Sequence, residues 1–311
     1  MLKNKLEVLH EELSQLLGND ELFWNEPLKD HTTFKIGGPA DLFIMPRTLD
    51  ELSETMQRIA KADVPLTILG SGSNVLVLDG GIQGVVVSLC HLKERLQCEG
   101  QSLLISAGFM LKDVSEFAYK NSLTGLEFAI GIPGTLGGAV FMNAGAYGGE
   151  MSQIVSKVRA VSLDGRINEY TLEELAFAYR HSRFHESHEI VAEVEMTLQP
   201  GEAQAILDTM NDLTERRMSK QPLEYASAGS TFKRPTGHYA GTLIEETGLK
   251  GLSCGDAEVS KKHAGFVVNK GTATASDVLT VIREVQQRVE QAHGVILEPE
   301  VRIIGRSGTE K

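Results

Sequence analysis

The stretch GIPGTLGGAVFMNAGAYGGE, residues 131–150, places seven glycines in twenty residues, whereas the whole chain has 31 glycines in 311 residues. Glycine at this density is typical of turns with positive φ, or of a main chain that another group approaches closely. Because so few side chains stand in the way, a flat or anionic ligand could lie directly on this backbone. The stretch therefore predicts a ligand-binding segment.

Two further glycine-rich turns precede it, HTTFKIGGPA at residues 31–40 and LGSGSNVLV at residues 69–77. In LGSGSNVLV, consecutive amides could form an anion-binding concavity, and the two serines add hydroxyl donors. It is not a Walker loop, since the GxxxxGK[ST] lysine is missing, and it fails GxGxxG, since the sixth position is Val75. Alone, LGSGSNVLV also fits a tight hairpin, and all three turns could be purely structural. Three such turns within the first 150 residues favour a long dinucleotide lying across one domain.

Composition and charge exclude several classes of protein. The chain is 41% hydrophobic and 23% charged, which is typical of a globular protein long enough for two or three domains. Its formal charge of −12 disfavours a nucleic-acid partner, because phosphate backbones bind basic surfaces. Three cysteines form no CxxC pair, and no apolar run reaches the roughly 18 residues of a membrane span. We therefore expect a cytoplasmic monomer with neither a membrane nor a nucleic-acid partner.

Helix signals are clear at two places in the N-terminal half. Thr48 and Glu51 have the spacing of a capping box, so a helix is predicted to begin near Leu49. Pro133 suits the first turn of a second helix, which would continue through residues 135–145. The small residues of that helix would let it pack closely against a neighbour or a ligand.

The C-terminal part begins after a break in composition at residues 199–202, where helical spacing follows over residues 203–220. The last helix is predicted to run from Ser276 to about His293 and to stop at Gly294. Strands alternate with these helices, so the pattern predicts an α+β fold. The predicted strands cover residues 65–70, 74–79, 84–89, 102–108, 154–163, 189–198 and 295–304.

Six segments, in order across residues 32–305, together resemble one known family: TTFKIGG, LGSGSNVLV, GIPGTLGGAVFMNAGAYG, YRHSRF, AGSTFKRP and LEPEVRIIG. The chain resembles the UDP-N-acetylenolpyruvoylglucosamine reductase family over nearly its whole length. This resemblance implies an FAD-dependent enzyme of bacterial cell-wall synthesis. It implies an FAD-binding region of the vanillyl-alcohol-oxidase (PCMH) type over residues 1–200, with subdomains of about 1–90 and 91–200. A smaller C-terminal α+β domain over residues 201–311, which includes a terminal strand, would bind the substrate.

The resemblance also implies which residues hold FAD. The turns at residues 33–37 and 70–75 would surround the pyrophosphate, and residues 131–148 would lie along the dinucleotide and the isoalloxazine ring. A Cβ at several of these glycines would then stand where the ring or the phosphates lie. The implied FAD-binding residues are Thr33, Lys35, Gly37, Leu69, Gly70, Ser71, Gly72, Ser73, Asn74, Val75, Gly131, Pro133, Gly134, Gly138, Asn143, Ala144, Gly145, Tyr147 and Gly148.

The implied reaction reduces UDP-N-acetylglucosamine enolpyruvate to UDP-N-acetylmuramate. NADPH reduces FAD, flavin N5 passes hydride to C3 of the enolpyruvyl group, and a proton reaches C2. Hydride addition moves charge onto the carboxylate, so the site needs positive charge and a proton donor. The resemblance assigns the carboxylate to Arg180, the proton to Ser230 and assistance at the developing enediolate to Glu300. We expect Glu300 to be protonated or tightly paired in the complex.

Binding of the UDP-sugar is implied for Tyr179, Lys220, Lys233 and Arg234, although the role of Arg234 stays open because some relatives have a different polar residue there. Each catalytic candidate also has a plain structural interpretation. Arg180 would then form a surface ion pair, Ser230 would be a turn serine, and Glu300 a sheet-edge acid.

Three histidines raise the alternative of a metal site. His181, His185 and His188 are spaced i, i+4 and i+7, which on a helix would place three imidazoles on one side, as in a zinc site. The resemblance makes this segment a loop and contains no catalytic metal. We therefore expect no metal.

Two other functions remain open at this point. An FAD-dependent oxidase of an alcohol or a sugar could use the same flavin domain, and it would need neither Ser230 nor Glu300. A noncatalytic nucleotide-binding protein is the third hypothesis, and it would stay colourless after incubation with FAD.

Overall fold

The structure, a computed structural model, describes residues 2–18 and 20–308 of the chain. This part of the chain forms two compact units, each assembled from separate stretches of sequence. The boundary expected at residue 200 stays a prediction. The first unit contains the chain up to Trp24, Leu42–Ser71 and Gly84–Arg217, and the second contains Asn25–Asp41, Gly72–Gln83 and the chain from Met218 onward.

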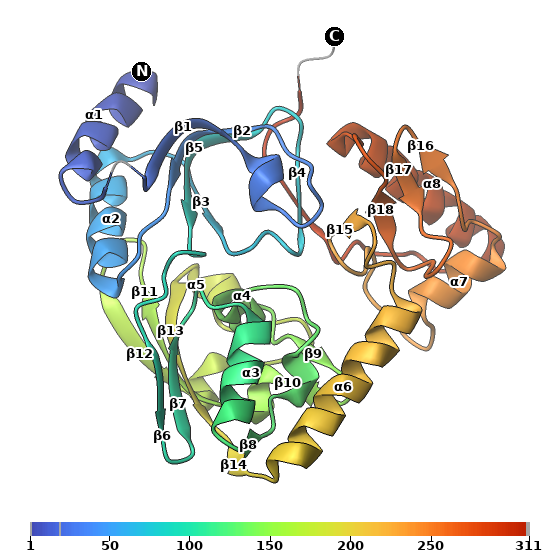
Figure 1. Cartoon of the computed structure of the whole chain (residues 1–311). Coiled ribbons are helices and arrows are strands. Elements are labelled where there is room, and N and C mark those ends of the chain that lie inside the picture. The colour runs from blue at the N-terminus through green and yellow to red at the C-terminus, as the bar shows by residue number, and fades with distance from the viewer. Residues whose placement is uncertain (1, 19, 309–311) are drawn as a thin grey trace. The chain divides into compact units, whose positions relative to one another are not determined.

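An antiparallel five-stranded sheet of order β12-β11-β13-β7-β6 runs through the first unit (Figure 1). Nearly every side chain of its middle strand β13 is buried, because both faces of that strand are covered. Helix α4 packs against β13. Gly137 permits close packing, since a Cβ there would lie 2.8 Å from the Cβ of Ala107. The elements are β6 (Leu96–Glu99), β7 (Ser102–Ser106), β11 (Val155–Val161), β12 (Ile167–Thr171), β13 (Ile190–Thr197) and α4 (Leu136–Phe141).

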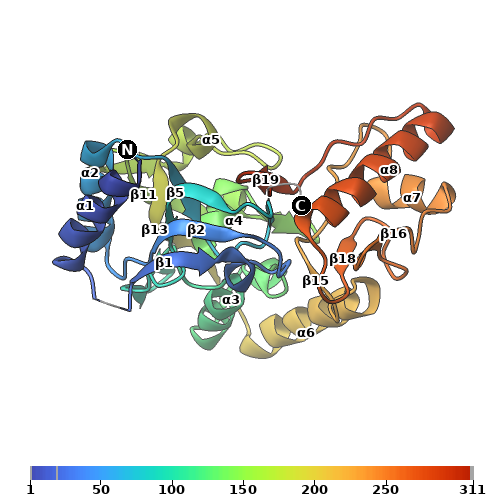
Figure 2. The same ribbon diagram turned by 90° about the horizontal axis from the view of Figure 1, so that it is seen from above.

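A second sheet has the order β1-β2-β5-β3, in which β3 and β5 are parallel. Helices α1 and α2 lie side by side in Figure 2, and their leucines join the core of the first unit. The Thr48 side chain accepts a hydrogen bond from the amide of Glu51, so the predicted capping box and the start of α2 at Leu49 are confirmed. The elements are α1 (Leu2–Ser14), α2 (Leu49–Ala62), β1 (Leu22–Pro27), β2 (Pro39–Ile44), β3 (Leu66–Leu69) and β5 (Ile82–Ser88).

The helix predicted over residues 203–220 is present as α6 (Ala203–Lys220), and α3 lies next to it in both views (Figures 1 and 2). No helix within the described residues is long and apolar enough to cross a membrane. The remaining elements of the first unit are α3 (Leu111–Lys120), α5 (Phe184–Ser187), β8 (Leu123–Thr124), β9 (Gly145–Ala146), β10 (Gly149–Glu150) and β14 (Gln199–Pro200), with 3₁₀ turns at Glu127–Ala129, Met151–Gln153 and Leu172–Leu175. A further 3₁₀ turn, Leu28–His31, lies in the second unit.

The second unit contains an antiparallel sheet of order β15-β18-β17-β16, helices α7 and α8, and a parallel pair of β4 and β19. The apolar face predicted for the last helix is buried, and Gly294 ends that helix in the left-handed conformation, as predicted. Asp79, which follows β4, accepts hydrogen bonds from the first amides of α8. The elements are β4 (Val75–Val77), β15 (Ala226–Ser227), β16 (Ser253–Cys254), β17 (Ala257–Val259), β18 (Val267–Asn269), β19 (Arg302–Ile304), α7 (Ala240–Glu246) and α8 (Ala275–His293).

Three expectations about local structure were wrong. The helix expected from Pro133 begins at Leu136, because Thr135 is its N-cap and accepts a hydrogen bond from the amide of Gly138. The strand expected over residues 295–304 is limited to Arg302–Ile304, since Pro299 lacks an amide donor in the middle of that run. LGSGSNVLV is not a hairpin, because β3 pairs with β5 and β4 pairs with β19.

Candidate active site

The glycine-rich stretch ends in a tight hairpin of β9 and β10. Ala146 pairs with Gly149, which leaves Tyr147 and Gly148 as a two-residue turn. Both turn residues have positive φ, 54° at Tyr147 and 90° at Gly148, as a type I′ turn requires. A tyrosine in this conformation is strained, and strained backbone is common at ligand sites.

The missing side chains of the predicted FAD-binding glycines have mostly an internal explanation. A Cβ at Gly70 would lie 2.7 Å from Thr135 Oγ1, and one at Gly72 would lie 2.4 Å from the carbonyl of His31. At Gly131 the added atom would lie 2.8 Å from Cδ of Arg217. At these three positions the protein itself would meet an added Cβ, so their glycines have an internal reason, and their contact with FAD stays a prediction.

Two glycines in the same set leave space open. A Cβ at Gly138 would meet Thr135 Oγ1 only at 3.6 Å, an ordinary contact. At Gly148 nothing lies within 4 Å, although the positive φ there still favours glycine. Gly138 and Gly148 are thus positions where another molecule could approach the main chain.

The LGSGSN turn carries an unsatisfied hydroxyl. Ser71 Oγ is buried and has no hydrogen-bond partner within the residues that the structure describes. A buried hydroxyl without a partner is costly, so it fits a site that a polar ligand completes. Leu69 ends β3 just before this turn, and Ser73 and Asn74 follow it into β4, which starts at Val75.

The turn around Thr33 is anchored inside the second unit. The Thr33 amide donates to the Gly72 carbonyl at 3.3 Å, and its hydroxyl donates to the Ser227 carbonyl at 2.7 Å. Lys35 has φ of 56° and an exposed side chain. Gly37 has φ of 145°, and a Cβ there would lie 2.8 Å from Cβ of Val77. The three residues therefore border the Gly72 end of the LGSGSN turn.

Tyr179 and Arg180 form the tip of a tight turn in the first unit. Ala178 and His181 exchange both backbone hydrogen bonds at 3.1 Å, and Arg180 has φ of 55°. The guanidinium lies over the Tyr179 ring, 5.0 Å from its centroid, and that ring is 60% exposed. The turn thus presents a cation and an aromatic ring together.

The end of α4 holds this turn on both sides. Asn143, which is 2% exposed, donates from Nδ2 to the Ala178 carbonyl at 3.1 Å and accepts from the Ser152 amide at 3.0 Å. Ser182 Oγ donates to the Phe141 carbonyl at 2.7 Å. The Asn143 side chain is therefore used within the protein, although it was predicted to contact FAD.

Ser230 and Glu300 lie close together in the second unit, although 70 positions separate them in the sequence. The Glu300 amide donates to the carbonyl of Thr231, the residue after Ser230, at 2.8 Å. Phe232 pairs with Pro299 as an antiparallel bridge next to this bond. Asn74 Nδ2 also donates to the Glu300 carbonyl at 3.4 Å. Ser230 is exposed and Glu300 is half-buried.

Sequence reasoning missed Thr231, the residue that joins these two segments. It is buried, and its hydroxyl accepts from the Val267 amide at 2.9 Å. Its position next to Ser230 was the only available signal.

The third catalytic candidate, Arg180, belongs to the first unit, whereas Ser230 and Glu300 belong to the second.

The residues predicted to bind the UDP-sugar have mixed surroundings. Lys220 is exposed at the end of α6. Lys233 forms an ion pair of 3.1 Å with Glu298, two residues before Glu300. The Arg234 guanidinium lies 4.1 Å from the centroid of the exposed Tyr239 ring, a contact that the sequence did not indicate.

Two of the three histidines in the 181–188 segment, His181 and His185, stack on one another. His181 and His185 have ring centroids 4.9 Å apart, and His185 also stacks on Phe141 at 4.0 Å. Only Phe184–Ser187 is helical, so the regular spacing of a long helix is absent from this described segment. Among the described residues no group of three or more His, Cys, Asp or Glu side chains could hold a metal ion.

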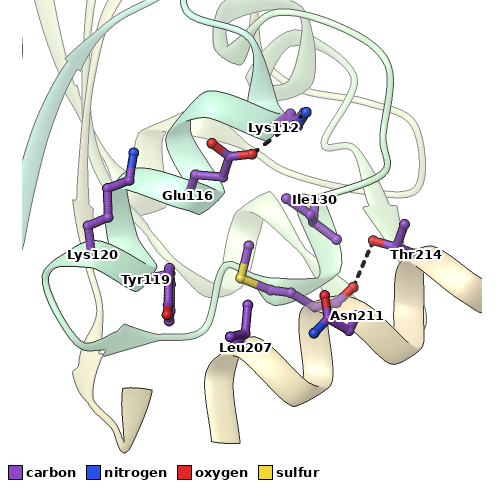
Figure 3. A pocket seen from close by; sticks show the side chains of 9 residues that line it. Lys112, Glu116, Tyr119, Lys120, Ile130, Leu207, Asn211 and Thr214 are labelled. Carbon is purple, nitrogen blue, oxygen red and sulfur yellow. Dashed lines mark hydrogen bonds and ion pairs between the residues drawn. The ribbon is translucent and has the colours of Figure 1, made fainter. Parts of the chain in front are cut away.

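A cavity of about 320 Å³ lies between α3 and α6, and none of the predicted site residues lines it. Figure 3 shows Glu116 beside Lys112, with which it forms an ion pair of 3.7 Å. Leu207 and Asn211 enter from α6, and Ile130, which precedes Gly131 in the sequence, also lines the cavity (Figure 3). The cavity is therefore a neighbour of the glycine-rich stretch and not part of the predicted site.

Comparison with known proteins decides the family. Residues 221–304 match the model of the UDP-N-acetylenolpyruvoylglucosamine reductase C-terminal domain, and residues 40–171 match an FAD binding domain. The reductase of Clostridium kluyveri is 46% identical over 97% of this chain and 99% of its own length, and that of Clostridium perfringens is 48% identical over 94% and 96%. The chain belongs to the UDP-N-acetylenolpyruvoylglucosamine reductase family.

A solved structure of this reductase family agrees. The crystal structure of the reductase from Thermus caldophilus has a TM-score of 0.79 and 38% identity, and the match covers 91% of this chain and 98% of that one. The predicted α+β fold, with an FAD-binding domain followed by the C-terminal domain of the reductase family, is confirmed. The protein is an FAD-dependent oxidoreductase, which excludes the noncatalytic hypothesis.

Proposed function

We propose that this protein reduces UDP-N-acetylglucosamine enolpyruvate to UDP-N-acetylmuramate with NADPH as the reductant, in the synthesis of peptidoglycan precursors. The observation that carries the proposal is the hydrogen bond of 2.8 Å from the Glu300 amide to the Thr231 carbonyl. It places a hydroxyl and a carboxyl on neighbouring segments of the domain that matches the reductase C-terminal model. In the proposed reaction the hydroxyl donates the proton to the enediolate and the carboxyl assists.

FAD, which we propose is held by the turns at residues 33–37, 69–75 and 131–148, supplies hydride chemistry when bound. The unpartnered Ser71 hydroxyl and the open space at Gly138 and Gly148 fit such a ligand. The Asn143 side chain already makes one donated and one accepted hydrogen bond within the protein, so we propose that it contributes to the FAD site mainly through its backbone. The backbone of residues 143–145 comes shortly after the end of α4 at Phe141, and we propose that its main-chain groups contact FAD.

Arg180 binds the substrate carboxylate in this proposal. A guanidinium can hold a carboxylate through two parallel hydrogen bonds and stabilise the charge that develops there. The left-handed turn fixes the main chain of Arg180, so less conformational freedom is lost when the carboxylate binds.

Ser230 donates the proton to C2, and Glu300 assists at the enediolate. A hydroxyl is a weak acid, yet an enediolate carbon is a strong base, so an aligned serine can complete the transfer. Tyr179, Lys220, Lys233 and Arg234 bind the UDP-sugar, and Lys233 exchanges its pairing with Glu298 for a phosphate. We also propose that the protein acts as a monomer.

One anaerobic titration tests this function. NADPH is added until the absorbance of oxidised flavin is lost, and UDP-N-acetylglucosamine enolpyruvate is then added. Recovery of the absorbance supports the reductase. Failure to recover, together with rapid flavin reduction by an alcohol or a sugar, would establish the oxidase instead.

A further inference from the structure

Arg217, on the last full turn of α6 in the first unit, lies half-buried against the glycine-rich stretch, and its Nε atom is fully covered. Its Nη1 donates to the Gly131 carbonyl. A Cβ at Gly131 would lie 2.8 Å from Arg217 Cδ and 3.0 Å from its Nε, so the glycine makes room for this side chain. Arg217 lies outside both matched regions, 40–171 and 221–304.

This cation lacks a counter-charge. Within residues 2–18 and 20–308 no carboxylate forms an ion pair with Arg217, and its buried Nε has no hydrogen-bond partner. Burial lowers the pKa of the Arg217 guanidinium, whereas a hydrogen bond with the Tyr147 phenol favours the charged form. The adjacent Arg216, in contrast, pairs with Asp212 at 2.8 Å on the exposed side of α6.

A guanidinium that is partly withdrawn from water without an anion beside it is costly to the folded protein. The Gly131 carbonyl and the Tyr147 phenol are its two polar neighbours, and the Nε donor stays unused at a point where FAD-binding residues are proposed. An arginine fork is well suited to a planar or tetrahedral anion. A ligand with a negative charge would compensate the charge of the Arg217 guanidinium.

We propose that Arg217 is a cofactor-binding residue that supplies the counter-charge for an anionic part of FAD. The inference rests on the proposed placement of FAD along residues 131–148. FAD offers two anions, the pyrophosphate in every redox state and the ring after reduction. Both can accept hydrogen bonds from the same guanidinium. Contact with the pyrophosphate would change the Kd of FAD, whereas contact with the reduced ring would change the midpoint potential of bound FAD.

The competing explanation is mechanical. The hydrogen bond from Arg217 could serve only to hold Gly131 against α6, and the affinity for FAD would then not depend on the charge of Arg217. This alternative predicts that loss of the side chain lowers the stability of the protein without FAD. A counter-charge role predicts the opposite, since removal of a buried, uncompensated cation relieves a cost in the absence of FAD.

The test compares wild type with Arg217→Met and Arg217→Lys, and uses Arg216→Met as the matched control on the same helix turn. Flavin fluorescence gives the Kd of FAD and of riboflavin, and a dye-coupled titration gives the midpoint potential of bound FAD. Thermal unfolding is followed with and without FAD, because a bound ligand raises Tm by an amount that grows with the logarithm of its concentration divided by Kd. None of these measurements requires the enolpyruvyl substrate, so failure here is distinguishable from failure of the proposed reaction.

We expect Arg217→Met to keep or raise the Tm of the protein without FAD and to reduce the increase in Tm that FAD gives. Pyrophosphate recognition predicts FAD binding at least about tenfold weaker, with riboflavin unaffected. Recognition of the reduced ring predicts a lower midpoint potential, by about 30 mV for each tenfold loss of affinity for the reduced form relative to the oxidised form. Arg217→Lys should restore most of either effect, and Arg216→Met should resemble wild type.

Unchanged FAD affinity and potential in Arg217→Met would overturn the proposal. So would a variant whose protein without FAD is unstable or does not fold while Arg217→Lys binds FAD no better than Arg217→Met, because that pattern identifies the mechanical role.

Discussion

Asn143 donates a hydrogen bond of 3.1 Å to the carbonyl of Ala178, which fixes the turn that presents Arg180. The same amide accepts from the Ser152 backbone. Asn143, two residues after the end of α4, therefore connects the glycine-rich stretch to the turn of Tyr179 and Arg180. In this arrangement Asn143 is a positioning residue for Arg180.

Asn143→Ala should weaken this connection. It removes one of the two hydrogen bonds that the Ala178 carbonyl accepts, the other coming from the His181 amide, and it leaves the half-buried Ser152 amide without its partner, at a cost of about 1–3 kcal/mol. We expect a lower Tm and a higher KM for the enolpyruvyl substrate, with flavin reduction by NADPH less affected. Asn121→Ala is the control, since Asn121 makes a similar but exposed bond to Phe117. Equal losses in both half-reactions would contradict the positioning role.

Ser230→Ala should separate the two half-reactions. NADPH should still remove the absorbance of oxidised flavin, because that step needs no proton donor at C2. Reoxidation by the enolpyruvyl substrate should slow by about 10² to 10⁴-fold, the range for loss of a general acid. Stopped-flow absorbance measures both rates, and Ser253→Ala, an exposed serine of β16, is the control. A fast second half-reaction would exclude Ser230 as the donor.

Arg180→Ala should slow reoxidation by roughly 10² to 10⁴-fold, through loss of a charge that stabilises the developing carboxylate dianion. Arg180→Lys should recover little of this loss, because an ammonium cannot form two parallel bonds to a carboxylate. Full recovery with lysine would show that only the charge matters.

Glu300→Gln should keep the backbone bond to Thr231 and change only the carboxyl. We therefore expect an unchanged Tm and a second half-reaction slower by about 10² to 10⁴-fold. A fall in Tm with normal kinetics would instead support the plain structural interpretation of Glu300.

Stability should depend on pH through His263. Burial lowers the pKa of His263, whose ring centroid lies 5.0 Å from that of Phe266. The unfolded chain therefore takes up a proton more readily, so stability is complete above the ordinary pKa of about 6.5 and is lost as the pH falls toward the lower pKa of the folded state. His263→Gln should flatten Tm against pH below neutrality. The exposed His238→Gln should not, and a similar flattening in both variants would refute the assignment.

Local signals predicted the regular elements well. The capping box at Thr48, the helix over residues 203–220 and the stop at Gly294 depend on neighbouring residues, so they can be read in sequence. Thr135 was overlooked because Pro133 offered a stronger helix-start signal. The motifs that resemble the reductase family identified the fold and the enzyme class.

Contacts between distant segments could not be predicted in this way. Nothing near Gly131 indicates that Arg217 lies against it, and nothing near Ala178 indicates Asn143. Periodicity reports which side of an element is buried and leaves the partner unspecified. Which atoms a side chain at each glycine would meet could therefore be found only from the structure.

The segment from Glu298 to Ile304 serves two purposes at once. Glu300 pairs with the backbone beside Ser230, and Arg302–Ile304 pairs with Val75–Val77, the strand that leaves the LGSGSN turn. A single proteolytic cut within these seven positions would detach the proton donor from its neighbour and remove lateral support from the cofactor turn in one event. Ageing or nicked preparations should accordingly lose colour and turnover together.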